Sequence, residues 1–341
     1  MPSSPLHTRQ SRRSPLRKAA IALLAAGALL VPAVPVSAST TDKPAAIAQP
    51  TPDSPVSGKL VPALRGDAAR AAAGSKLSEQ VLKRGEALKD SPKAGGDRKT
   101  GADLQTSATP LPPWSGSLHT VWGAFPTVVS DGAQATHTVN PGISIPSGNP
   151  DVVYAPTLVP SGKTCIEVTT FYWQGGNGVG AWDWCAASPG FAAVAWINSS
   201  FLSTYTTTYQ GLPAYEVLDV QTNATTNSWT AYLWNYTTST WDALFTSADT
   251  SKLVDPHGGW DMFEVYTEYN SATGEGYYCT ETYGTQFHAA NIKIKVSGTW
   301  STLTTSNSSV TPPGSVSSSD FGCYGLSFTL QTANSHWQVS H

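Results

Sequence analysis

The residues best placed to do chemistry lie at 259–270, GWDMFEVYTEYN, where acidic and apolar side chains alternate. Successive side chains of a β-strand point to opposite faces, so Glu264 and Glu268 would share one face with Trp260 and Tyr266. The other face is apolar enough to lie against a core. The pattern predicts carboxylates among aromatic rings, which suits carboxylate chemistry or sugar contact. The alternative is a half-exposed strand whose glutamates only confer solubility.

A second candidate strand, CIEVTTFYWQ at 165–174, carries Glu167 on the face of Phe171 and Trp173. A buried glutamate is costly unless it is protonated, hydrogen-bonded or used in function. If Glu167 and Glu264 faced each other on one concave sheet, each would raise the pKa of the other. One would then stay protonated while the other served as general base toward water. The alternative is two unrelated surface glutamates.

Other hydrolytic chemistries have no support in the sequence. It contains no HExxH, no paired-histidine metal spacing and no GxSxG. The glycine-rich stretch 175–180 precedes neither a lysine nor a helix signal, so it predicts a hairpin or a mobile loop, not a phosphate site. Histidines beyond the amino terminus are scattered singly, and we interpret each as a surface or packing residue: His119, His137, His257, His288, His336 and His341.

Residues 1–38 have the form of a secretory signal peptide. Five basic residues precede an apolar run at 19–31, and small residues end the segment at Val36-Ser37-Ala38. No segment offers the roughly 20 continuous apolar residues of a membrane span. We therefore expect a secreted, extracellular protein. Arg12-Arg13 also resembles a twin-arginine signal, and the export route stays open.

Four cysteines, an even number in an exported chain, predict disulfides. Three pairings are possible. We favour Cys165 with Cys185 and Cys279 with Cys323, because each closes a modest loop. The spacing matches no zinc site, and the sequence indicates no metal and no organic cofactor.

Charge divides the chain near residue 114. Residues 114–341 hold four lysines, no arginine and fifteen Asp and Glu, a formal charge of −11, whereas residues 39–113 carry a net charge of +3. An acidic domain without arginine is a poor candidate for nucleic acid or anionic membranes. We expect residues 39–113 to form a prosegment or linker, with a flexible leader at 39–66 and a helix at 67–90.

The texture of residues 114–341 predicts one all-β domain, an antiparallel two-sheet β-sandwich of the jelly-roll or concanavalin-A-like kind, and a monomer. A β-propeller would need a period of about 40 to 50 residues, which is absent. Turn residues separate many of the expected strands. These strands are 119–128, 151–159, 164–174, 191–197, 214–221, 228–236, 241–246, 260–269, 276–283, 290–296 and 323–332.

The order of these segments resembles the secreted glutamic peptidases of the neprosin and eqolisin type. Residues 165–168 (CIEV) and 259–265 (GWDMFEV) resemble the two catalytic strands of that family, and 181–185 (AWDWC) and 227–234 (NSWTAYLW) resemble aromatic strands between them. The resemblance implies a β-sandwich, a precursor form and an acid-active endopeptidase that cleaves protein or peptide substrates. It implies Glu264 and Glu167 as the catalytic pair, with Gln174 as a substitute for the first position.

Two carbohydrate alternatives stay open. Glu264 and Glu268 have the Glu-x-x-x-Glu spacing of laminarinase-like glycoside hydrolases, although Tyr266 replaces the Asp that those enzymes have between them. Twelve tryptophans and thirteen tyrosines would also suit a lectin-like domain that stacks on a polysaccharide.

Overall fold

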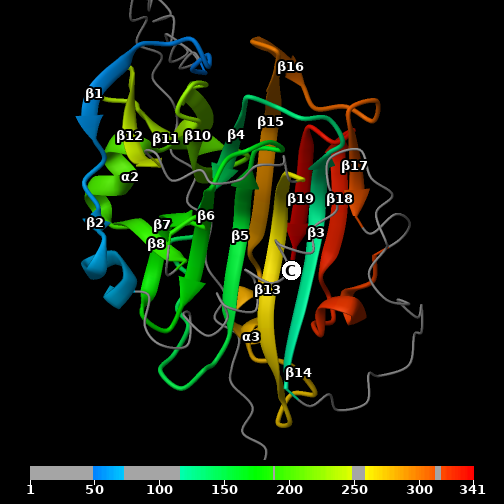
Figure 1. Cartoon of the computed structure of the whole chain (residues 1–341). Coiled ribbons are helices and arrows are strands. Elements are labelled where there is room, and N and C mark those ends of the chain that lie inside the picture. Colours follow the sequence, from blue (N-terminus) through cyan, green and yellow to red (C-terminus); the bar gives the residue numbers. More distant parts are fainter. Residues whose placement is uncertain (1–48, 73–115, 187–188, 248–257, 312–315) are drawn as a thin grey trace, which may run out of the picture. The chain divides into compact units, whose positions relative to one another are not determined.

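The computed structural model describes residues 49–72, 116–186, 189–247, 258–311 and 316–341 (Figure 1). These residues belong to one compact unit, 49–341. Among them, no helix has both the length and the apolar character required to cross a membrane. The predicted signal peptide and most of the predicted prosegment lie outside the described residues.

The described chain forms two sheets. The nine-stranded sheet has the order β17-β3-β13-β5-β6-β7-β8-β2, with β14 paired to β13. Its strands are β17 (Ser308–Thr311), β3 (Ser117–Pro126), β13 (Trp260–Asn270), β5 (Val152–Val159), β6 (Ile166–Trp173), β7 (Gly176–Asp183), β8 (Gly190–Trp196), β2 (Leu64–Arg65) and β14 (Glu275–Gly276).

The ten-stranded sheet has the order β1-β12-β11-β10-β4-β15-β19-β18, with β9 on β10 and β16 on β15. Its strands are β1 (Val56–Leu60), β12 (Thr240–Ser247), β11 (Ser228–Asn235), β10 (Leu212–Asn223), β4 (Gly132–Thr138), β15 (Gln286–Val296), β19 (His336–Ser340), β18 (Ser327–Thr332), β9 (Thr207–Tyr209) and β16 (Thr299–Thr302). Short helices are α2 (Ser199–Tyr205), α3 (Tyr278–Thr282) and the 3-10 turn η1 (Ser318–Phe321). The all-β two-sheet sandwich is confirmed, and one strand pair, β1 with β12, is parallel.

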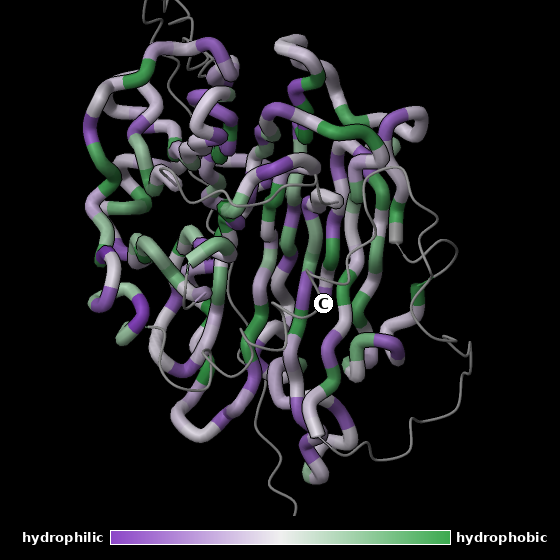
Figure 2. Tube along the Cα trace, in the orientation of Figure 1, coloured by the Kyte–Doolittle hydropathy of each residue, from purple (hydrophilic) through white to green (hydrophobic). Residues whose placement is uncertain are grey.

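One face of each sheet builds the main core. Phe263 and Val265 of β13 lie in the same buried cluster as Val217 of β10 and Leu233 of β11, which belong to the opposite sheet. Figure 2 shows hydrophobic residues recurring along the strands of both sheets. Because side chains alternate along a strand, the residues between these core positions must point to the outer faces.

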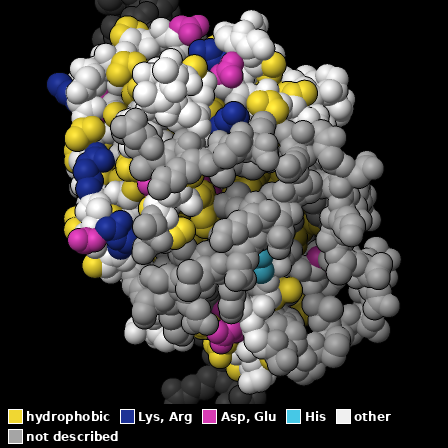
Figure 3. Space-filling view, in the orientation of Figure 1, with side chains coloured by type: hydrophobic (Ala, Val, Ile, Leu, Met, Phe, Trp, Pro, Cys, Tyr) yellow, Lys and Arg dark blue, Asp and Glu magenta, His cyan; other side chains and the backbone are white. Residues whose placement is uncertain are grey.

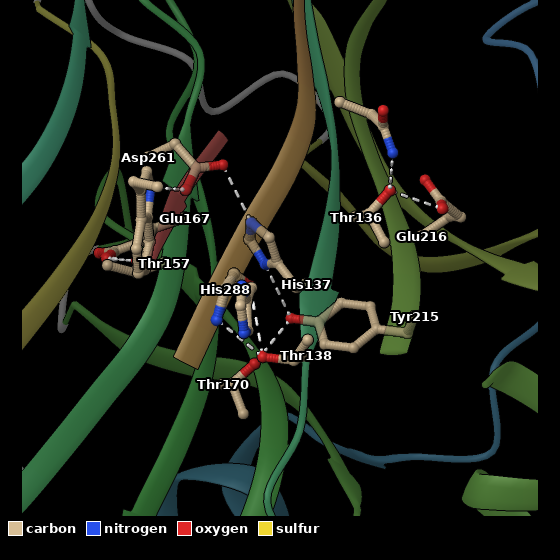
Figure 4. Close-up of polar contacts among 12 residues, drawn as sticks. Thr136, His137, Thr138, Thr157, Glu167, Thr170, Tyr215, Glu216, Asp261 and His288 are labelled. Atoms are coloured by element: carbon tan, nitrogen blue, oxygen red, sulfur yellow. Dashed lines mark hydrogen bonds and ion pairs between the residues drawn. The ribbon is translucent and has the colours of Figure 1, made fainter. Parts of the chain in front are cut away.

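A buried polar chain also links the two sheets (Figure 4). Asp261 of β13 and His137 of β4 are both fully buried, and Nε2 of His137 lies 3.0 Å from the Asp261 carboxylate. The same carboxylate accepts the indole N–H of Trp337 at 2.9 Å. The His137 Nδ1 lies 3.2 Å from the Tyr215 hydroxyl, which lies 2.9 Å from the hydroxyl of Thr170. The lone histidine at 137 is therefore a core hydrogen-bonding residue.

Both predicted disulfides are confirmed, Cys165–Cys185 and Cys279–Cys323. The strand expected at 276–283 is wrong, because this segment forms α3. Its first helical N–H, at Tyr278, is accepted by the carboxylate of Asp151 at 2.6 Å. The same carboxylate accepts the backbone N–H of Glu268 at 2.9 Å. Asp151, 127 positions away, thus satisfies an N–H of the first turn of α3 that the N-cap residue Tyr277 does not.

The flexible leader expected at 39–66 is also wrong over its described part. Residues 56–60 and 64–65 form β1 and β2, one at an edge of each sheet. The expected helix begins at residue 67 and is described to residue 72. The glycine-rich stretch 175–180 lies in the β6–β7 hairpin and in β7. Glycine is required at 180, where a Cβ would lie 2.1 Å from the ring of Phe191.

Buried carboxyl groups should make the sandwich more stable in acid. Burial raises the pKa of Glu216 from 4.5 to about 7, against hydrogen bonds from Thr136 and Gln134. Between these values the folded state holds a proton that the unfolded state lacks, so this contribution is complete below about pH 4.5 and lost as the pH rises through 7. Burial likewise raises the pKa of Asp219, whereas it lowers that of His288 to about 4, which acts in the opposite direction.

We therefore expect Glu216→Gln to flatten the pH dependence of unfolding. Urea unfolding at pH 5 and pH 7 measures this directly. From pH 7 to pH 5 the unfolding free energy of the wild type should rise more than that of the variant, by about 1 kcal/mol or more, because the pKa shift of Glu216 is large. Identical pH slopes for the two proteins would contradict the assignment of Glu216.

Candidate active site

Both candidate glutamates lie on one face of the nine-stranded sheet. Glu167 is the second residue of β6, between Ile166 and Val168 of the main core. Glu264 lies in β13, between Phe263 and Val265 of the same core. Alternation therefore points both carboxylates to the outer face. They are buried, with exposed fractions of 0% and 1%.

A β-bulge in β5, the strand between β13 and β6, shapes this face. Met262 and Glu264 pair with Thr157 and Tyr154, so one residue of β13 opposes two residues of β5. The β5–β6 register shifts at the same place. In a regular strand Thr157 would follow Val153 and Ala155 into the core. The bulge turns its hydroxyl to the glutamate face instead, as bulges near functional sites commonly do.

Glu167 is held by two donors. The Thr157 hydroxyl donates to its Oε1, and the indole N–H of Trp184 donates to its Oε2 at 3.0 Å. Figure 4 shows the contact between Thr157 and Glu167. Trp184 stacks on Trp182, which is the register partner of Glu167 on β7. The surroundings therefore fix the orientation of this carboxyl group.

Glu264 is held by His119 of β3. The ring Nε2 of His119 donates to Oε1 of Glu264 at 2.8 Å. The imidazole also lies parallel to the ring of Tyr266, with centroids 4.1 Å apart and an interplanar angle of 6°. The side chain of His119 is 38% exposed, whereas that of Glu264 is 1% exposed. The interpretation of His119 as a surface or packing residue is therefore incomplete, since it contacts a candidate catalytic group.

The two carboxylates are separated by β5. The register places Trp260 opposite Val159, and continuing the β5–β6 register by one residue places Val159 opposite Glu167. Glu264 lies four residues beyond Trp260. Two strand spacings and four residues place the two Cα atoms about 16 Å apart in a regular sheet. His119 holds the Glu264 carboxylate on the side of β13 that lies away from β6. At this separation each carboxyl group can contact a different atom of a bound substrate.

Aromatic rings line the same face, but they are not open platforms. Trp260 and Tyr266 are 7% and 3% exposed, and Trp173 and Trp182 are also buried. Figure 3 shows hydrophobic side chains among the described residues on this side of the molecule. Within the described chain, the indole N–H groups of Trp173, Trp182 and Trp260 have no hydrogen-bond partner. Because these rings are buried, they offer no open surface on which a sugar could stack. The indole N–H groups are hydrogen-bond donors that this face provides.

Gln174 and Glu268 lie away from the pair. Gln174 follows the end of β6, seven residues along the chain from Glu167. Its side-chain oxygen accepts the backbone N–H of Gly148 at 3.0 Å. Glu268 is exposed near the end of β13. The β3–β13 register is unbroken from Asp261 to Glu268, so Glu264 and Glu268 stay about 13 Å apart at Cα. A retaining glycosidase needs carboxyl groups about 5 to 5.5 Å apart, so the laminarinase alternative gains no support.

Two clusters in the described chain bring three potential metal ligands within 4.8 Å. One is Cys165, Asp183 and Cys185, and the other is Glu275, Cys279 and Cys323. In both, the two cysteines form a disulfide. A cysteine binds metal as its thiolate, so neither cluster offers a suitable donor set.

Three contacts of the site escaped the sequence analysis: His119, Thr157 and Trp184. The strand expected at 119–128 included His119, but nothing local showed which strand would lie beside it. Thr157 could not be found because the bulge that turns it outward is set by pairing with β6 and β13. Trp184 was one of many aromatic residues, and its hydrogen bond to Glu167 depends on the β6–β7 hairpin.

No protein-family model matches the chain, and no curated protein matches it. Among solved structures, it is similar to Scytalido-glutamic peptidase with a peptide-based transition-state analogue, at 17% identity and a TM-score of 0.36. It is also similar to SCP-B, a member of the eqolisin family of peptidases, in complex with a tripeptide, at 13% identity and a TM-score of 0.36. Each match covers 65% of this chain and all of the other. The function is therefore argued from the geometry of this chain.

Replacing His119 tests its role at Glu264. We expect His119→Ala to lower kcat/KM for a hydrolysed substrate by about 10- to 100-fold, because a hydrogen bond to a charged group contributes about 1.5 to 3 kcal/mol. His119→Gln, which retains an N–H donor, should recover part of the loss. Full activity of His119→Ala would contradict a role for His119 in orienting Glu264.

Proposed function

We propose that this protein is a secreted, acid-active peptidase in which Glu264 and Glu167 hydrolyse peptide bonds. One observation carries the proposal: two buried carboxyl groups project onto one face of one sheet from β13 and β6, which only β5 separates. Each group is oriented by its own nitrogen donor, His119 or Trp184. Buried, oriented carboxyl groups are costly to a fold and are typical of catalytic sites. The hypothesis from the sequence likewise required Glu167 and Glu264 to lie on the same face of one sheet.

The separation of the two groups suggests a division of labour. Glu264, as carboxylate, takes a proton from water while the water oxygen bonds to the peptide carbonyl carbon. Glu167, as carboxylic acid, gives its proton to the leaving nitrogen as the C–N bond breaks. The carbonyl oxygen gains negative charge in the intermediate and requires a hydrogen-bond donor. The indole N–H of Trp260, on the same face, is buried and has no hydrogen-bond partner within the described chain, so it would serve once a bound substrate reaches it.

An acidic optimum follows from this scheme. One of the two carboxyl groups must carry a proton and the other must not, a combination that is populated near carboxyl pKa values. The formal charge of −11 on residues 114–341 acts in the same direction, because protonation reduces self-repulsion. Two disulfides are consistent with an extracellular location.

The first test is a pH series. The secreted protein is incubated with a denatured protein substrate between about pH 2.5 and 7, and new amino termini are counted. The proposal predicts cleavage that is strongest in the acidic half of this range. A protein that cleaves nothing at any pH but binds members of a glycan panel would replace the proposal with the carbohydrate-binding alternative.

A further inference from the structure

Residues 49–66, here called the amino-terminal strap, join both sheets at one side of the sandwich. Its β1 pairs in parallel with β12, and its β2 pairs with β8. Backbone hydrogen bonds flank both strands: Trp241 N–H to Pro55 at 2.8 Å, Val61 N–H to Ala243 at 2.9 Å and Gly66 N–H to Ala192 at 3.0 Å. The strap therefore covers an edge of each sheet, where strands otherwise present unpaired backbone groups.

The side chains of the strap enter the sandwich. Val61 is 1% exposed and belongs to the main core, whereas its neighbour Leu60 is 62% exposed. Ser57 donates to the carboxylate of Asp242, which is buried in β12 and also accepts from Tyr205. Loss of the strap would open the core at Val61 and remove one donor from a buried carboxylate.

Arg65 fastens the end of the strap to β12. Its guanidinium donates to the Leu244 carbonyl at 2.6 Å and to the Val61 carbonyl at 2.9 Å. Beyond the strap, Arg70 lies close enough to Asp183 to favour that residue's charged form, although burial is the larger effect and raises the pKa of Asp183. Figure 3 shows Lys and Arg side chains along the side that carries β1 and β2. The strap itself has a formal charge of only +1, from Lys59 and Arg65 against Asp53, beside a sandwich of strongly acidic charge.

We infer that the strap is a permanent component of the folded protein, which stays bound without a covalent link after the chain is cut between residues 73 and 115. The functional form after such a cut is a two-chain protein, in which the strap occupies the edges of β12 and β8. This inference concerns only the stability of the assembly and holds whether or not the protein is a peptidase. It departs from the expectation of a prosegment, 39–113, that leaves as a whole.

The sequence provides a selective way to test this. Arginine is absent from 114 onward, whereas Arg84 and Arg98 lie between the strap and β3. An arginine-specific protease should therefore cut the full-length protein only before β3. Cuts after Arg70, Arg84 or Arg98 leave the strap whole, whereas Arg65 lies within it, so a strap peptide that ends at Arg65 is distinguished by its mass. The nicked protein is passed through size exclusion in native buffer and in guanidinium chloride, and each fraction is identified by mass spectrometry.

The strap peptide should co-elute in native buffer with the fragment that begins after the cut, at residue 71, 85 or 99, and ends at 341, and it should separate in denaturant. Val61→Asp should weaken its retention at least about tenfold, because it places an unpaired carboxylate in the core. Leu60→Asp, one residue away and exposed, should retain the peptide like the wild type. Elution of the wild-type peptide away from the folded sandwich, or equal release in the two variants, would overturn the inference.

Discussion

Glu264→Gln should nearly abolish peptide-bond cleavage, with kcat/KM lower by about 10² to 10⁴-fold, the usual contribution of a general base. Glutamine preserves the shape of the side chain and can still contact His119, but it cannot take a proton from water. Glu167→Gln should cause a loss of the same order, because an amide cannot protonate the leaving nitrogen. Initial rates on one peptide substrate at the acidic optimum measure both effects.

The chain offers a matched control on the same strand. Glu268 lies in β13 four residues from Glu264, but it is exposed. Glu268→Gln should keep kcat/KM within about twofold of the wild type, as expected for an exposed residue outside the chemistry. Equal losses in Glu268→Gln and Glu264→Gln would point to electrostatics of the whole face and would contradict a specific role for Glu264.

Asp261→Ala should lower the unfolding free energy by about 3 to 5 kcal/mol, the usual cost of breaking a buried pair by removing one partner. The variant leaves the Trp337 indole N–H and His137 Nε2 without their carboxylate, and both groups are buried. Urea unfolding at constant pH, with the disulfides intact, measures the change. Glu268→Gln is again the control and should remain within about 0.5 kcal/mol.

A double-mutant cycle identifies the interaction itself. His137→Ala should also be strongly destabilising, and the double variant should lose less than the sum of the two single losses, because both remove the same contact. Additive losses would mean that His137 and Asp261 act independently. A change below about 1 kcal/mol in Asp261→Ala would contradict the view that this chain of hydrogen bonds holds the two sheets together.

Local alternation was enough to predict the face of each glutamate. Around Glu264 and around Glu167, flanking apolar residues enter the core and leave the carboxyl group on the opposite side, as the strand period requires. The same rule located most strands. It could not show that β13 and β6 are separated by a single strand, because strand order depends on pairing between segments about 100 residues apart.

The missed features all depend on distant partners. Thr157 faces Glu167 only because β5 is bulged, and the first N–H of α3, where a strand was expected, is bonded to the distant Asp151. The strap has the proline, serine and glycine composition of a flexible leader, yet it forms strands on edges supplied by β12 and β8. In each case tertiary contacts outweigh local propensity, so a short window of sequence holds too little information.

The most direct test of the central claim compares the wild type with the Glu264→Gln, Glu167→Gln double variant on one denatured protein at acidic pH. New amino termini are identified by mass spectrometry, and the unfolding midpoint of each protein is measured in the same buffer. The account predicts many new termini with the wild type and none above background with a folded double variant. Equal cleavage by the two folded proteins would contradict it.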